Sequence, residues 1–177
     1  MRKAILSILL LILALIFTSC SNGGTETGLS GDNDEKIADE TFNKMITAVR
    51  LEDDSQLADM FSNTIKNEDD LSQSASMFID FIQGDIVSHS SASEAGVGVD
   101  YKTESGKNRK EIQSAFYITT TESTYYIAIK ECIKDEVDNN IGLLSIYIIE
   151  ANNWTEDYVY RGDGKWIPGI NIVDALA

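Results

Sequence analysis

The sequence predicts an α+β protein in which N-terminal helices pack on a curved antiparallel sheet. Apolar residues recur with a helical period in the first half of the chain and alternate with a strand period in the second half. The change between the two patterns comes at Gly84. With 177 residues, of which 43% are hydrophobic, the chain has the size and composition of one globular domain.

Three helices are expected before Gly84. The first covers residues 34–50, where apolar side chains recur about every 3.6 positions. A shorter second helix and a longer third helix each begin at an aspartate, whose carboxylate can accept hydrogen bonds from the first turn. The expected starts are Asp53 or Asp54 for the second helix and Asp69 or Asp70 for the third. The third helix is expected to end at Gly84, because glycine favours helix termination.

Five strands are expected after Gly84, separated by short polar turns that predict an antiparallel meander. They are expected at residues 85–90, 97–102, 111–120, 125–133 and 141–150. The last of these is apolar on both of its faces, which indicates a strand inside the sheet with both faces covered. The helices are expected to cover one face, and a partner subunit or the C-terminal segment is expected to cover the other.

The first nineteen residues are typical of a secretory signal peptide. Two basic residues, Arg2 and Lys3, precede an uncharged core at residues 4–17, and the small residues Thr18 and Ser19 follow it. A helix over residues 4–17 would be about 21 Å long, which is shorter than the hydrocarbon core of a bilayer at about 30 Å. We therefore predict a cleaved signal at residues 1–19 rather than a membrane-spanning helix.

The segment Phe17-Thr18-Ser19-Cys20 resembles the lipobox of bacterial lipoproteins, although that family usually has Leu, Val or Ile where this chain has Phe17. The resemblance implies that Cys20 is acylated, with palmitate-type chains, and anchors the protein to the extracytoplasmic face of the cell membrane. Residues 20–33 are rich in small and polar residues and are predicted to form a flexible tether. Residues 34–177 are then a single α+β domain. The alternative is an ordinary secreted protein in which a cysteine falls at this position by chance.

Three further segments carry a second resemblance: "LADMFS" from residue 57, "MFIDFIQGDI" from residue 77 and "WIPGINI" from residue 166. Together they resemble uncharacterised lipoproteins of Gram-positive bacteria with a cystatin-like, or nuclear-transport-factor-two-like, cone. The resemblance implies a pocket between the helices and the concave face of the sheet. Tyr117, Tyr126 and Trp166 are the residues predicted to line such a pocket, and packing in the core would explain them equally well.

Charge and motifs limit the possible functions. The formal net charge is −15, which argues against nucleic acid as a ligand, because phosphate contacts require clustered Lys and Arg. No metal-binding spacing, dinucleotide loop or phosphate loop is present, so no metal or cofactor is expected. Cys132 lies in an apolar stretch and is expected to be a buried strand residue rather than a nucleophile.

A binding module without catalytic activity is the favoured function, with an unknown small molecule or another envelope protein as its partner. An isomerase or hydrolase that uses Asp85 and His89 is the first alternative, since some cone proteins are built on an Asp or an Asp-His pair. Residues four apart in a strand lie about 13 Å apart, however, which is too far for a direct hydrogen bond. An immunity or adaptor protein for a secreted partner is the second alternative. A homodimer through the sheet is compatible with the binding module.

Overall fold

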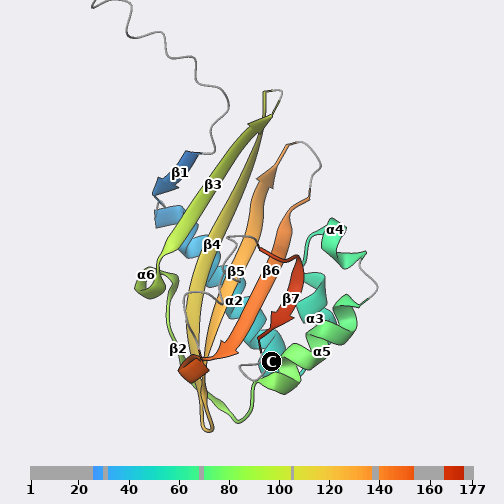
Figure 1. Cartoon of the computed structure of the whole chain (residues 1–177), viewed down its shortest axis with the longest axis vertical. Helices are drawn as coiled ribbons and strands as arrows, with labels where there is room; N and C mark the ends of the chain where they lie inside the picture. The colour runs from blue at the N-terminus through green and yellow to red at the C-terminus, as the bar shows by residue number, and fades with distance from the viewer. Residues whose placement is uncertain are drawn as a thin grey trace, which may run out of the picture.

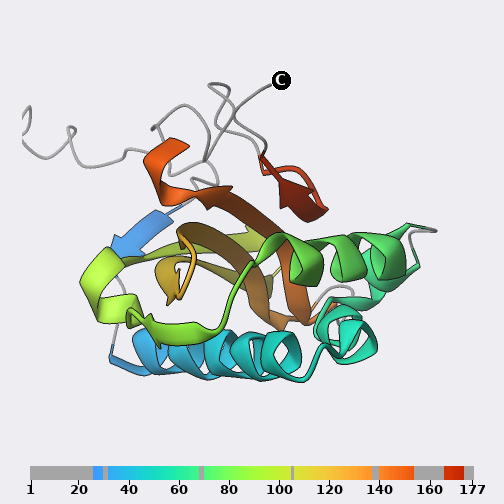
Figure 2. The same cartoon turned by 90° about the horizontal axis from the view of Figure 1, so that it is seen from below.

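The computed structural model shows helices packed on one face of a curved, open sheet (Figures 1 and 2). The structure describes residues 26–29, 32–67, 70–104, 106–136, 140–153 and 166–173. The predicted signal peptide and Cys20 lie outside the described residues. The predicted α+β class is confirmed, and the arrangement is consistent with a nuclear-transport-factor-two-like cone.

The sheet has seven strands in the order β1-β3-β4-β5-β6-β7, and β2 pairs with the far end of β4. All pairs are antiparallel except β6 with β7, which run parallel. The strands are β1 (Glu26–Leu29), β2 (Ile86–His89), β3 (Val97–Glu104), β4 (Lys107–Thr120), β5 (Thr124–Asp135), β6 (Gly142–Glu150) and β7 (Gly169–Ile172). The helices are α2 (Asp32–Arg50), α3 (Asp54–Asp59), α4 (Asn63–Lys66), α5 (Leu71–Phe81), α6 (Ala92–Ala95) and the 3-10 turn η1 (Ala151–Asn153).

The expected order of helices and strands is confirmed, with five additions. The strand β1 lies within the segment predicted to be a tether, where it pairs with the edge of β3 through the backbone. Its sequence, ETGL, has little apolar content, so the composition gave no signal for a strand. The helices α4 and α6 are single turns of four residues, too short to show a helical period. The strand β7 and the 3-10 turn η1 are the remaining additions.

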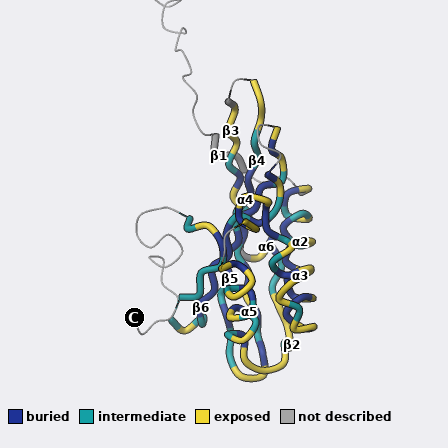
Figure 3. The backbone as a smooth tube through the Cα atoms, turned by 90° about the vertical axis from the view of Figure 1, so that its right-hand side faces the viewer, coloured by how far each residue is buried: buried dark blue, intermediate teal, exposed yellow. Residues whose placement is uncertain are grey.

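The hydrophobic core lies between α2 and the central strands (Figure 3). Phe42 of α2 stacks on Phe116 of β4 with ring centroids 3.9 Å apart and an interplanar angle of 3°. Burial of each such side chain contributes about 1.5–3 kcal/mol. The resemblance implied a pocket on this side of the sheet, but these core side chains fill the space between α2 and β4.

The link between α3 and α4 is hydrogen-bonded to the start of β6. The backbone N–H of Ser62 donates to the carbonyl of Leu143 (2.9 Å), and the N–H of Leu143 donates to the carbonyl of Met60 (3.0 Å). Gly142 makes this close approach possible, because a Cβ there would come within 2.9 Å of the carbonyl oxygen of Met60 and the nitrogen of Ser62. The φ angle of Gly142 is +128°, a conformation that other residues rarely adopt.

Of the two aspartates at the starts of α3 and α5, one caps its helix through a side-chain hydrogen bond. The carboxylate of Asp53 accepts a hydrogen bond from the N–H of Gln56 (2.8 Å) and caps α3 as expected. Asp70 occupies the cap position of α5 without a hydrogen bond from its side chain. Among the described helices, none is both long enough and apolar enough to span a bilayer.

The substitution Gly142→Ala is expected to lower the free energy of unfolding by about 2 kcal/mol or more, because the new Cβ meets backbone atoms and the φ angle is strained. Gly98→Ala is the matched control, since its Cβ would have only ordinary contacts at 3.8 Å or more. Its effect is expected to stay within about 1 kcal/mol. Equilibrium urea unfolding measures both values, and equal stability of the two variants would contradict this account of β6.

Candidate binding cleft

The face of the sheet opposite the helices, which we call the open face, carries the candidate site. Residues 166–168 cross this face beside β6 on their way to β7. The hydroxyl of Ser145 donates to the carbonyl of Ile167, and the N–H of Ile167 donates to the phenol oxygen of Tyr147 (2.8 Å). The C-terminal segment, one of the two covers considered for the second face of β6, therefore lies over part of that face and leaves a cleft beside it.

The cleft has a volume of about 380 Å³ and lies where four strands and two connecting segments meet. Side chains from β3, β4, β5 and β6 line it, together with residues from α4, from the segment before β6 and from the segment before β7. They are Thr64, Ile65, Lys102, Arg109, Glu111, Lys130, Asn140, Leu144, Ser145, Trp166 and Pro168. Charged and polar groups predominate among them.

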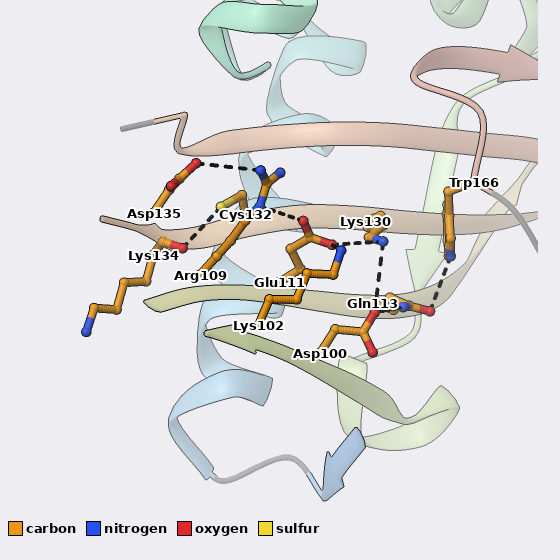
Figure 4. A network of polar contacts seen from close by, with 10 residues as sticks. All are labelled: Asp100, Lys102, Arg109, Glu111, Gln113, Lys130, Cys132, Lys134, Asp135 and Trp166. Atoms are coloured by element: carbon orange, nitrogen blue, oxygen red, sulfur yellow. Dashed lines mark hydrogen bonds and ion pairs between the residues drawn. The ribbon is translucent and has the colours of Figure 1, made fainter. Parts of the chain in front are cut away.

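Three cations surround one buried carboxylate in this cleft, and we call Lys102, Arg109, Glu111 and Lys130 the Glu111 cluster (Figure 4). The Glu111 carboxylate lies 2.7 Å from Nε of Arg109, 2.9 Å from Nζ of Lys130 and 3.8 Å from Nζ of Lys102. The side chain of Glu111 is only 4% exposed. Burial alone would raise its pKa, but the hydrogen bond and charge of Lys130 and the charges of Lys102 and Arg109 lower it. Glu111 is therefore an ionised counter-ion to three cations.

Strand register brings the cluster together. Lys102 pairs with Arg109, and Asp100 pairs with Glu111, across the hairpin of β3 and β4. On the other side of β4, Gln113 pairs with Lys130 of β5. Alternate residues of a strand share a face, so all of these side chains lie on the open face. The cluster was not predicted from the sequence, although the two-residue connection between β3 and β4 fixes this register and could have indicated it.

Further polar contacts hold the margin of the cluster (Figure 4). Gln113 donates from Nε2 to Asp100 (2.7 Å) and accepts at Oε1 from the indole N–H of Trp166 (3.3 Å). The Trp166 ring also packs edge-on against Tyr147, with centroids 5.4 Å apart and an angle of 81°. These contacts fix the orientation of the Trp166 ring at the wall of the cleft.

The comparisons with known proteins give one result. Residues 44–151 match the family described as Domain of unknown function (DUF5104). The chain belongs to this family. No curated protein and no solved structure matches the chain. The DUF5104 segment includes the whole Glu111 cluster, whereas Trp166 and Cys20 lie outside it.

The residues predicted to line a pocket separate into two groups in this DUF5104 protein. Trp166 lines the cleft. Tyr117 and Tyr126 form a cross-strand pair with ring centroids 5.3 Å apart, also on the open face. They lie four positions along their strands from Gln113 and Lys130, which is about 13 Å, and do not line the cleft.

Asp85 and His89 lie in different surroundings. Asp85 precedes β2 and lines a separate cleft of about 640 Å³ between the ends of α2 and α5. The ring of His89 packs edge-on against Phe42, with centroids 5.4 Å apart, and its Nδ1 lies 3.1 Å from the carbonyl of Ser90. Among the contacts of the described residues, none joins Asp85 to His89.

Cys132 is a buried strand residue of β5, as predicted. Its thiol donates to the carbonyl of Lys134 (3.3 Å). Burial raises the pKa of the thiol, and the nearby charge of Arg109 opposes the shift without reversing it. Within the described part of the chain, no group of three His, Cys, Asp or Glu side chains could hold a metal ion.

A second buried carboxylate, Glu131, lies on the helix side of β5 and is only 6% exposed. Its register partner is Ile112, the neighbour of Glu111. The hydroxyl of Thr41 donates to one oxygen (2.8 Å), and the other oxygen has no hydrogen-bond partner among the described residues. Burial raises the pKa of Glu131 to about 7, against weaker opposing effects of Thr41 and Lys44.

The substitution Glu131→Gln is expected to change how stability depends on pH. The pKa is about 7 in the folded protein and 4.5 in the unfolded chain, so the folded state binds the proton more tightly. The stabilisation from this proton is complete below about pH 4.5 and is lost as the pH rises through 7, a change of roughly 3 kcal/mol. Urea unfolding at pH 5 and pH 8 should show Glu131→Gln gaining stability relative to the wild type mainly at pH 8.

Glu111→Gln is the matched comparison, because the pKa of Glu111 is lowered and its stabilisation is present at high pH and lost as the pH falls. It is expected to destabilise the protein at pH 8. A gain from Glu131→Gln that is the same at both pH values would show that the buried charge is not its cause.

Proposed function

We propose that this DUF5104 protein is a lipid-anchored, extracytoplasmic binding module without catalytic activity. The cleft on the open face carries the proposal, because it places the exposed ammonium of Lys102, two partly buried cations and an oriented aromatic ring around a space of about 380 Å³. Ligand pockets in proteins have volumes of about 300–1,000 Å³ and a few convergent polar groups. An enzyme built on Asp85 and His89 has no such support, since the two residues lie in different surroundings.

The anchoring part of the proposal rests on the sequence. Cys20 directly follows the signal-like residues 1–19. Bacterial lipoproteins carry their acyl chains on a cysteine at this position. Two or more acyl chains give stable attachment to a bilayer, so no membrane-spanning helix is needed. The proposed location is therefore the outer face of the cell membrane.

Cys20→Ser is expected to abolish incorporation of labelled palmitate and to move the protein from the membrane fraction to the soluble fraction. Cys132→Ser is the matched control, since Cys132 is the other cysteine of the chain and is buried in β5. It is expected to keep both the label and the membrane location. Label that persists in Cys20→Ser would place the lipid elsewhere and refute the anchoring proposal.

The binding proposal is tested by native mass spectrometry of the full-length protein extracted from membranes of its own host. We expect a retained small molecule, and we expect Trp166→Ala to lose it because Trp166 lines the cleft. Tyr117→Ala is the control, since this side chain is on the open face outside the cleft. An adduct that survives Trp166→Ala would place the site elsewhere. A dimer or a bound protein in place of an adduct would favour a homodimer through the sheet, or the adaptor alternative.

A further inference from the structure

We infer that the cleft takes a small anion, a ligand that presents a carboxylate or a phosphate group to Lys102, Arg109 and Lys130. The inference rests on the proposed binding function and specifies its ligand. Three observations carry it: the gathering of cations in the cleft, the unused donors of the cations, and the fixed position of the groups around them.

The cleft gathers cations on an otherwise acidic protein. The whole chain has 14 Lys and Arg against 29 Asp and Glu, a formal charge of −15. Three cations, Lys102, Arg109 and Lys130, and one carboxylate, Glu111, line the cleft. Asp135 and Asp100 pair with Arg109 and Lys130 at the margin, so the six groups together are neutral, and Lys102 is the exposed cation among them. A cleft with low-dielectric walls concentrates the field of the charges that line it. An anion that the rest of the surface repels is therefore attracted to the exposed ammonium of Lys102.

The cations keep donors that the protein does not use. Nζ of Lys102 has one ion pair among the described contacts, at 3.8 Å, beyond hydrogen-bond distance, and the side chain is 53% exposed. Arg109 pairs through Nε with Glu111 and through Nη1 with Asp135 (3.7 Å). A guanidinium has five N–H donors and an ammonium has three, so both groups retain donors for a carboxylate or a phosphate.

Glu111 holds the cations in place before any ligand arrives. The three positive groups each lie within 4 Å of a carboxylate oxygen of Glu111. Without this shared counter-ion they would repel one another and move apart. One carboxylate compensates only one of the three charges, and Asp100 and Asp135 compensate from the margin, outside the lining of the cleft. The anionic group of a ligand is thus expected at Lys102, with its remaining atoms against the ring of Trp166.

The fluorescence of Trp166 can report binding, because its ring lines the cleft. The chain has two tryptophans, so a Trp154→Phe background leaves Trp166 as the only one. The full-length protein in detergent is titrated with inorganic phosphate and, separately, with succinate at constant ionic strength, while Trp166 fluorescence is recorded. At least one of the two anions is expected to give a saturable change.

Lys102→Gln is expected to weaken the binding by about tenfold or more, because it removes one charge-assisted contact. Lys107→Gln is the matched control: it removes the same charge from the same hairpin at an exposed position outside the cleft, and less than a twofold change is expected.

The two anions distinguish a phosphate ligand from a carboxylate ligand. Equal weakening in Lys102→Gln and Lys107→Gln would show general charge attraction and overturn the inference, as would the absence of any response up to about 10 mM. A retained neutral or cationic molecule that Trp166→Ala releases would leave the binding function in place and refute only its anionic ligand. Absence of both a retained molecule and an anion response would refute both proposals.

Discussion

The strand β4 is the element on which the rest of the molecule depends, because its two faces belong to different environments. One face places Ile112, Phe116 and Ile118 against the helices, where all three are fully buried. The other face places Glu111 and Gln113 at the cleft. Since successive side chains of a strand point to opposite faces, the packing of Phe116 on Phe42 also determines where Glu111 lies. A shift of one residue in register would move the carboxylate into the core.

Glu111 and Glu131 show how position alone separates two chemically identical groups. Both are almost completely buried, and they occupy neighbouring rows of the β4–β5 ladder on opposite faces. Glu111 has three cations within 4 Å and remains charged, whereas Glu131 has one hydroxyl donor and holds its proton up to about pH 7. Burial favours a raised pKa for both carboxyls. The nearby cations reverse this effect for Glu111 and not for Glu131.

The sequence predicted the elements of the fold better than it predicted their contacts. Long periodic segments such as α2 and β4 were recognisable because their apolar patterns extend over several turns or residue pairs. The two-residue connection after Glu104 is recognisable in the sequence, and it fixes the register that places Lys102 opposite Arg109. The pattern could not show the bulge in β5, where Asp135 comes opposite Arg109, because a single extra residue leaves no mark in an alternating pattern. Trp166 lies at the cleft through tertiary packing beside β6. Tyr117 and Tyr126, which were predicted to line a pocket, form a cross-strand pair too far along the strands to reach the cleft.

The short strand β1 has a consequence for where the cleft operates. Glu26 is the first residue of β1 and pairs with Tyr101, the neighbour of Lys102. With the lipid on Cys20, only five residues separate the membrane attachment from this strand, and they span at most about 20 Å. Under the proposed anchoring, the lipid would be joined to the sheet next to Lys102. The cleft would sample the layer of solution directly above the bilayer, and the molecules concentrated in that layer are the ones it encounters first.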